Sequence, residues 1–158
     1  VRDSKLLTPE KREVLYDLIL EAAVTWGIGS VSHEVIDAVG IAAATRQAML
    51  AAVEGLVQAP DYLLIDYFHL PETRIPHHGV MHGDSVCFSI SCASIIAKVT
   101  RDRYVTELDG HYPGYGFAAH KGYSTEEHLA CLRRLGPCPV HRRTFRPVFD
   151  IMSIDETA

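Results

Sequence analysis

A carboxylate that ends an otherwise apolar segment is the first candidate for chemistry. Residues 62–66 (YLLID) predict a strand buried on both faces of an α/β sheet, and that strand ends on Asp66. A buried carboxylate is costly unless it is paired, so Asp66 requires an arginine, a helix N-terminus or a metal ion. Ligands of open α/β sheets gather beyond the carboxyl ends of the strands. Asp66 is therefore a candidate ligand for metal or substrate, and a structural salt bridge is the alternative.

A second carboxylate, Asp84, follows Gly83 shortly before a predicted helix, where its side chain can fold back over the same sheet edge. An ordinary turn aspartate is the alternative at this position. Phosphoryl cleavage by two Mg²⁺ or Mn²⁺ ions ~4 Å apart generally uses three or four carboxylates. Asp66 and Asp84 supply only two, and the other acidic residues are predicted to lie on helix surfaces or in linkers.

Histidines and glycines do not complete a known catalytic motif. The segment FHLPETRIPHHGVMHGD is predicted to be irregular, and its histidines lack the i, i+4 spacing of a zinc pair, which favours surface-loop residues: His77, His78 and His82. The sequence has no phosphate-binding P-loop, dinucleotide fingerprint or G-x-S-x-G elbow.

An aromatic residue beside a cation stands in the loop HKGYST. Tyr123 lies between Gly122 and Ser124 and close to Lys121. An exposed ring next to a cation can stack on a base or sugar while the cation holds the phosphate. A structural lid is the alternative for a tyrosine in a glycine-rich loop.

The charge is distributed unevenly. The chain has a net charge of −5, but residues 110–149 hold six Lys or Arg against two Glu, so this segment carries 6 − 2 = +4 and the remainder −9. A positive segment on an acidic body can bind a polyanion while carboxylates elsewhere hold metal. A solvated surface is the alternative.

Length and composition limit the class of protein. With 158 residues, 47% of them apolar, the chain fits one globular domain that needs no disulfide or metal to fold. No apolar run is long enough to span a membrane. The four cysteines match no zinc or redox pattern, so we expect reduced thiols in a cytoplasmic protein.

Secondary-structure signals alternate along the chain. Strand–helix alternation with short links predicts a layered α/β domain. Ser124 and Glu127 form a predicted capping box, and Ser91 or Ser94 is expected in the first turn of the preceding helix. The expected helices cover about residues 8–23, 41–56, 93–108 and 124–135, and the expected strands cover 24–32 and 62–66.

Taken together, these strings resemble type 2 ribonuclease H, the ribonuclease HII family. The resemblance covers essentially the whole chain and includes the segments RDSKLLTPEKRE, LLID, HGDS, SISCASIIAKVTRDR and YPGYGFAAHKGYSTEEHLACLRRLGPCPVHRRTFRPV. It implies a ribonuclease H-like layered fold, with a central mixed sheet flanked by helices and a C-terminal segment of helices and loops. We expect one domain over residues 1–158, with 110–149 as its basic substrate-binding segment.

The resemblance also implies an activity. It implies a monomeric, metal-dependent endonuclease that hydrolyses the RNA strand of RNA/DNA hybrids and cleaves at single ribonucleotides in duplex DNA, leaving 3′-OH and 5′-phosphate ends. Mn²⁺ or Mg²⁺ is the implied cofactor. Asp66 and Asp84 match catalytic, metal-binding carboxylates, and Tyr123 matches a tyrosine that stacks at the RNA–DNA junction. The other residues implied to bind substrate are Ser4, Lys5, Lys121, Arg142 and Arg143, with His141 in the same HRR motif.

One departure from the family is large. The family's first strand carries an Asp-Glu pair in a DEAGRG segment, some tens of residues before the position of Arg2, and the only Asp-Glu pair here is Asp155-Glu156. The chain begins at Val1 without an initiator Met. We therefore expect the N-terminal strands to be missing from this sequence and the chain alone to be inactive.

Two smaller departures are Tyr67, where a glycine commonly follows the aspartate, and Thr144 in place of a serine. Two functions remain open at this point. The first is a ribonuclease whose sequence is incomplete, which the presence of both Asp66 and Asp84 favours. The second is a catalytically inactive module that still binds nucleic acid.

Overall fold

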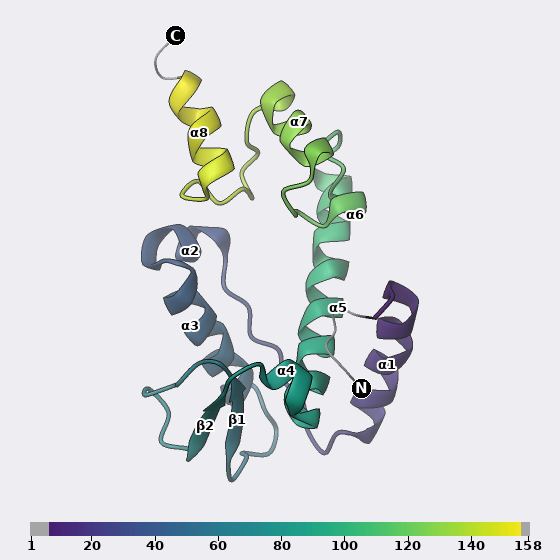
Figure 1. The fold of residues 1–158 in the computed structure, drawn as a ribbon, viewed down its shortest axis with the longest axis vertical. Helices are drawn as coiled ribbons and strands as arrows, with labels where there is room; N and C mark the ends of the chain where they lie inside the picture. The colour runs from purple at the N-terminus through teal and green to yellow at the C-terminus, as the bar shows by residue number, and fades with distance from the viewer. Residues whose placement is uncertain (1–6, 156–158) are drawn as a thin grey trace. The chain divides into compact units, whose positions relative to one another are not determined.

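The computed structural model of the 158-residue chain describes residues 7–155. Helices predominate in this range (Figure 1). The elements in chain order are α1 (Pro9–Ala22), α2 (His33–Val39), α3 (Ile41–Glu54), β1 (Leu63–Asp66), β2 (His77–Val80), α4 (Gly83–Val86), α5 (Phe88–His111), α6 (Phe117–His120), α7 (Glu126–Leu135) and α8 (Arg146–Asp155).

The chain divides into two compact units. Unit 1 comprises residues 1–31 and 42–100, and unit 2 comprises 32–41 and 101–158. Helix α5 contributes to both, because the division falls between Thr100 and Arg101. The expected single domain over the whole chain stays a prediction, and each unit is described by itself.

Local sequence signals account for the first helix of unit 1. Thr8 is the N-cap of α1, and its hydroxyl accepts a hydrogen bond from the Lys11 amide at 3.4 Å. Pro9 occupies the first helical position, where its missing N–H costs nothing. The predicted helix over 8–23 is thereby confirmed.

The segment between α1 and α2 is extended but is not a strand, so the expectation for residues 24–32 was wrong. Its glycines lie against the backbone of α3. A Cβ on Gly27 would meet the Ala52 carbonyl oxygen, and a Cβ on Gly29 would meet that of Ala48. In the described structure this segment therefore packs closely against a helix.

The sheet of unit 1 consists of two parallel strands in the range that the structure describes. In Figure 1, β1 and β2 run side by side, with Asp66 opposite Val80. β2 lies in the segment expected to be irregular. Ile65 is buried, but Leu64 is 46% exposed, so the expected burial of this strand on both faces was also wrong. Helices together with a parallel strand pair agree with the expected α/β class.

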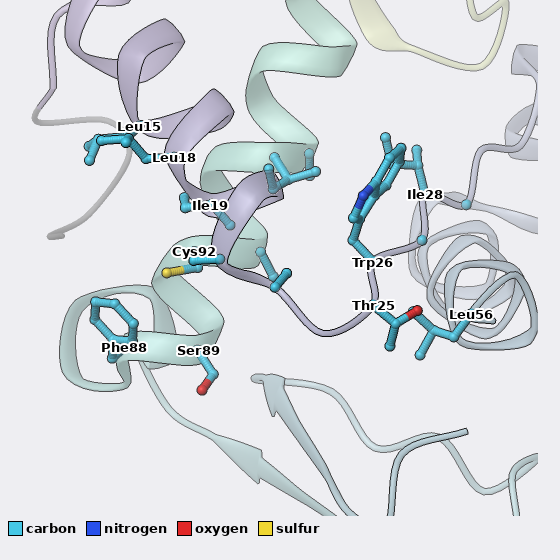
Figure 2. Close-up of a pocket in the computed structure, with 17 residues that line it drawn as sticks. Leu15, Leu18, Ile19, Thr25, Trp26, Ile28, Leu56, Phe88, Ser89 and Cys92 are labelled. Carbon is cyan, nitrogen blue, oxygen red and sulfur yellow. The ribbon is translucent and has the colours of Figure 1, made fainter. Parts of the chain in front are cut away.

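An apolar pocket of about 680 Å³ lies within unit 1. Figure 2 shows Leu18 and Ile19 of α1, Trp26 of the extended segment, and Phe88 and Cys92 of α5 around it. Phe88 is 69% exposed and Trp26 49% exposed, so this face of unit 1 presents large apolar side chains to solvent.

The core of unit 2 is formed by Val105, Tyr115, Phe117, Leu132 and Val148. Helix α7 packs against α6 and α8. The N-cap of α7 is Thr125 rather than Ser124, one residue later than predicted, and its C-cap is Gly136 as expected.

Helix α5 is longer than the sequence indicated. It begins at Phe88 rather than near residue 93. Ser91, its fourth residue, lies in the first turn as expected, whereas Ser94 lies further inside the helix. Helices α2 and α8 were not predicted.

We predict that Gly29→Ala destabilises unit 1 by about 2 kcal/mol, the usual size of an overpacking penalty, because the added methyl group meets the Ala48 carbonyl of α3. Gly110→Ala is the matched control, since a Cβ there meets nothing within 4 Å and the residue lies inside α5. Urea unfolding followed by circular dichroism measures both variants. Equal stability of Gly29→Ala and the unchanged protein would contradict the close packing of this segment.

Candidate active site

Asp66 ends β1, and its carboxylate is held by a backbone amide. The Gly83 N–H donates to Asp66 Oδ1 at 2.7 Å. Gly83 is the first residue of α4, which contacts β1. Of the partners that the sequence left open for Asp66, the structure shows the amide at the start of a short helical turn. A hydrogen bond of this kind stabilises the ionised carboxylate and fixes one of its oxygens.

Asp84 follows that amide directly and is only 9% exposed. Ser85 Oγ lies 3.4 Å from Asp84 Oδ1. Gly83 has no room for a side chain, because a Cβ would lie 2.5 Å from Ile90 Cδ1 and 3.2 Å from Asp66 Oδ1. The chain thus brings both candidate carboxylates to one end of β1, as the sequence predicted.

These two carboxylates supply the right kind of ligand for a metal ion, but not a full set. Carboxylate oxygens are the donors that Mg²⁺ and Mn²⁺ prefer. Across residues 7–155, however, no group of three or more His, Cys, Asp or Glu side chains is arranged to hold a metal ion. The described part of the chain therefore offers two candidate metal ligands, Asp66 and Asp84, and no complete set.

His77 has a structural role beside β1. Its Nε2 accepts a hydrogen bond from the Leu70 amide at 3.3 Å, and its Nδ1 lies 3.0 Å from the Ile75 carbonyl oxygen. His77 therefore supports the turn before β2.

In unit 2, Tyr123 presents its ring to solvent, with 54% of the residue exposed. The cation over this ring is Arg101, whose Cζ lies 4.8 Å from the ring centroid. The sequence suggested Lys121 for that position. The Lys121 ammonium instead donates to Thr106 Oγ1 at 2.6 Å and to the Ala118 carbonyl at 2.5 Å. Arg101 was missed because helical periodicity places it on a polar face without showing what it contacts.

The backbone around Tyr123 is held at several points. Its N–H donates to the His120 carbonyl at 2.9 Å, and its carbonyl accepts from the Thr125 N–H at 2.8 Å. Lys121 and Gly122 both adopt left-handed conformations, with φ of 52° and 74°. This exposed tyrosine therefore stands on an ordered turn.

Three buried histidines lie beneath this turn: His120, His128 and His141, each 5–8% exposed. The rings of His120 and His128 stack at 4.1 Å, and Phe117 contacts all three. His128 Nδ1 lies 2.9 Å from the Tyr123 carbonyl oxygen, and its Nε2 lies 3.1 Å from Nε2 of His141. The Cys138 amide donates to His141 Nδ1 at 3.0 Å.

This environment disfavours protonation of two of the rings. Burial, reinforced by the nearby His128, lowers the pKa of His141 to about 4. Burial also lowers the pKa of His128. The Cys138 carbonyl, 3.3 Å from His141 Nδ1, favours protonation of His141, but burial prevails.

The basic segment that follows His141 is anchored by a carboxylate of α2. Asp37 accepts hydrogen bonds from the Arg143 amide at 2.8 Å and from the Thr144 amide at 3.0 Å. The Thr144 hydroxyl also donates to it at 2.6 Å. Burial opposes ionisation of Asp37, but these hydrogen bonds prevail and lower its pKa. The Arg142 guanidinium stacks over Phe145 at 4.4 Å, and Arg143 is exposed.

Two predicted substrate contacts, Ser4 and Lys5, lie outside the described residues, as does Glu156. No helix in residues 7–155 is long and apolar enough to cross a membrane.

The family is decided by comparison with known proteins. The sequence profile described as "Ribonuclease HII" matches residues 1–150. The chain belongs to the ribonuclease HII family. The ribonuclease HII of Dehalococcoides mccartyi is 55% identical over 148 residues, which cover 94% of this chain and 70% of that protein. The ribonuclease HII of Geobacter sulfurreducens is 50% identical over 148 residues, which cover 94% of this chain and 68% of that protein.

A solved structure, the ribonuclease H2 from Pyrococcus horikoshii OT3, matches with a TM-score of 0.79. It covers 99% of this chain and 82% of that chain at 23% identity, so it supports the fold. Membership of the ribonuclease HII family makes the protein an endoribonuclease of the ribonuclease H class.

The geometry explains one of the two small departures from the ribonuclease HII pattern, Thr144, and shows that the other, Tyr67, is strained. Tyr67 has a φ of 64°, a left-handed conformation in which glycine is favoured. Thr144 replaces a serine at a position where the hydroxyl is the group that bonds Asp37. Threonine keeps that hydroxyl, so the substitution preserves the contact.

We predict that the stability of this ribonuclease HII chain falls as the pH decreases from about 6.5 to about 4. The unfolded imidazole of His141 binds a proton near pH 6.5, whereas the folded one does so only near its pKa of about 4. Between these values the unfolded state holds the extra proton, so stability is retained above pH 6.5 and declines on acidification. The contribution of this one group is about 3 kcal/mol.

Urea unfolding at several pH values tests this prediction. His141→Gln should flatten the slope of stability against pH in this window, whatever its overall stability. His111→Gln, at an exposed residue of α5, is the control and should retain the slope. An unchanged slope in His141→Gln would contradict the assignment.

Proposed function

We propose that this chain forms the larger part of an enzyme that hydrolyses the RNA strand of RNA/DNA hybrids and cleaves at single ribonucleotides in duplex DNA. The products are 3′-OH and 5′-phosphate ends. Two divalent ions, Mn²⁺ or Mg²⁺, serve as cofactor. Family membership and the names of the relatives support the ribonuclease H activity. The monomeric state and the cytoplasmic location stay predictions.

The observation that carries the proposal is the joint placement of two carboxylates. The Gly83 amide bonds Asp66 and the next residue is Asp84, so a single turn at the end of β1 positions both. Bound divalent ions activate the attacking water and stabilise the leaving oxygen in phosphodiester hydrolysis. For these two residues, the proposed role is to hold the ions, and the Gly83 amide keeps one Asp66 oxygen oriented.

Residues of unit 2 are proposed to hold the nucleic acid. The Arg143 amide is anchored by Asp37 and Arg142 is the residue before it, and cations on a fixed backbone suit contacts to phosphates. Tyr123 offers an exposed ring for stacking. Lys121 is proposed to act mainly through its structural bonds to Thr106 and Ala118.

A second candidate function is nucleic-acid binding without cleavage. It is favoured by one observation, the lack of a third metal-binding side chain in the described range. The presence of both Asp66 and Asp84 argues against it, because binding alone does not require two carboxylates on one turn.

We predict that the 158-residue chain alone does not cleave a hybrid, and that joining it to an N-terminal segment with the family's Asp-Glu pair produces Mn²⁺-dependent cleavage. Two carboxylates cannot hold both ions. In the joined protein, Asp66→Asn should abolish turnover while hybrid binding persists, since affinity comes mainly from phosphate contacts.

A turnover assay and an anisotropy titration on one labelled hybrid measure these effects. Asp61→Asn, at an exposed residue before β1, is the matched control and should retain activity. Efficient cleavage by the unjoined chain, or by Asp66→Asn, would refute this assignment of the metal ligands. Failure of the joined protein to cleave would favour the binding module.

We predict that Tyr123→Ala in the joined protein loses more activity at a single embedded ribonucleotide than on a long hybrid. Stacking on a base is worth ~1–3 kcal/mol. A single ribonucleotide offers only one cleavage site, so its cleavage depends on this positioning, whereas a long hybrid offers many sites. Kinetics on both substrates measure the difference. Equal losses would show that Tyr123 is a general scaffold residue.

A further inference from the structure

We propose that His128 is a positioning residue for Tyr123, and that His141 fixes the orientation and hydrogen-bonding direction of His128. This inference rests on the proposed stacking role of Tyr123 and extends it to the residues that make its position reproducible. Both histidines belong to unit 2, whereas the proposed metal ligands belong to unit 1.

The first step is that the backbone determines the proton on each ring. His141 Nδ1 faces three groups of Cys138: the N–H at 3.0 Å, the Sγ at 3.0 Å and the carbonyl oxygen at 3.3 Å. The N–H is closer than the carbonyl and can only donate, so Nδ1 accepts and the neutral ring carries its proton on Nε2. The Tyr123 carbonyl only accepts, so His128 carries its proton on Nδ1 and its Nε2 is free to accept.

These two assignments agree at the point where the rings meet. His141 Nε2–H donates to His128 Nε2 at 3.1 Å, and His128 Nδ1–H donates to the Tyr123 carbonyl at 2.9 Å. One continuous series of hydrogen bonds thus runs from the Cys138 amide to the Tyr123 carbonyl. Every bond in it points the same way. The Tyr123 carbonyl requires the proton of His128 on Nδ1, and the contact between the two Nε2 atoms then requires the proton of His141 on Nε2.

The third histidine supports the same turn independently. The Gly122 amide donates to His120 Nδ1 at 3.1 Å, and His120 Nε2 lies 2.8 Å from the Tyr115 carbonyl oxygen. His120 therefore also holds a neutral tautomer, stacked on His128. The bond from the Gly122 amide to His120 fixes the backbone position of Gly122, the residue before Tyr123.

The contrast in burial points to positioning rather than to packing alone. His128 is 5% exposed, whereas the Tyr123 residue that it bonds is 54% exposed. Apolar side chains would fill the space around Phe117 equally well and at lower cost, because buried polar groups must all be satisfied. What the histidines add is a directed bond to the carbonyl of an exposed aromatic residue.

The test uses the 158-residue chain, so it does not depend on catalysis. Four variants are compared: His128→Ala, His128→Asn, His128→Gln and Leu132→Ala. The amide nitrogen of Asn occupies the position of Nδ1, so Asn can still donate to the Tyr123 carbonyl, whereas the amide nitrogen of Gln corresponds to Nε2. Leu132→Ala is the matched control, because Leu132 is a buried core residue one turn further along α7.

The first measurement is backbone ¹⁵N relaxation of residues 122–124 in the protein without nucleic acid, which reports how mobile this turn is. We expect this turn to become mobile in His128→Ala and His128→Gln, to stay ordered in His128→Asn, and to be unaffected in Leu132→Ala. Long-range ¹H–¹⁵N spectra of the unchanged protein should show the proton of His128 on Nδ1. An ordered turn in His128→Ala, equal mobility in Leu132→Ala, or the opposite tautomer would overturn the proposal.

The second readout is stacking on a duplex with one ribonucleotide and 2-aminopurine beside it. We expect the unchanged protein to quench 2-aminopurine emission, and His128→Ala to lose most of that quenching, as Tyr123→Ala does. The dissociation constant for an all-DNA duplex should change by no more than about twofold, since phosphate contacts provide that affinity.

The two readouts separate the two hypotheses. If Tyr123→Ala quenches as strongly as the unchanged protein, the stacking role of Tyr123 is refuted while the relaxation data still decide the role of His128. If Tyr123→Ala loses the quenching and His128→Ala retains it, the positioning role of His128 is refuted and the proposed function stands.

Discussion

The hydrogen bond between the Gly83 amide and Asp66 is the contact on which the proposed chemistry of unit 1 depends. It joins the end of β1 to the start of α4 across 17 residues of sequence. The pairing of Asp66 with Val80 already brings the two segments together, and this hydrogen bond fixes the start of α4 against the carboxylate itself. With it, the positions of Asp66 and Asp84 are set by backbone atoms, which adjust less readily than side chains.

In unit 2, the contacts of interest are those that hold the exposed ring of Tyr123 in place. A tyrosine available to a ligand cannot be fixed by burial, so its order must come from its backbone. The structure provides that order through two left-handed residues, through the Thr125 amide and through His128. The anchoring of Arg143 and Thr144 by Asp37 follows the same rule, because the backbone is held while the charged side chain stays accessible.

Much of this was accessible from the sequence, and the failures have physical causes. Capping and periodicity located α1, α3 and α7, because those signals are local. β2 was missed because HHGV carries no alternating pattern and becomes a strand only through pairing with β1. The contact of Arg143 with Asp37 spans 106 residues, and no local sequence pattern indicates a contact between residues so far apart. The strand predicted over residues 24–32 was wrong because β-rich residues around Gly27 and Gly29 suit close packing on a helix as well as strand pairing.

The left-handed Tyr67 has a consequence for how stability is distributed. A non-glycine residue in this conformation carries a strain of about 1 kcal/mol or more. That strain sits immediately after Asp66, and the Tyr67 ring is 64% exposed, with Phe68 edge-on at 5.6 Å. A glycine would remove the strain but also the aromatic surface. This strain lowers the stability of unit 1, so contacts elsewhere in the unit must offset it. It lies directly after Asp66, where the proposed metal binding requires a fixed backbone.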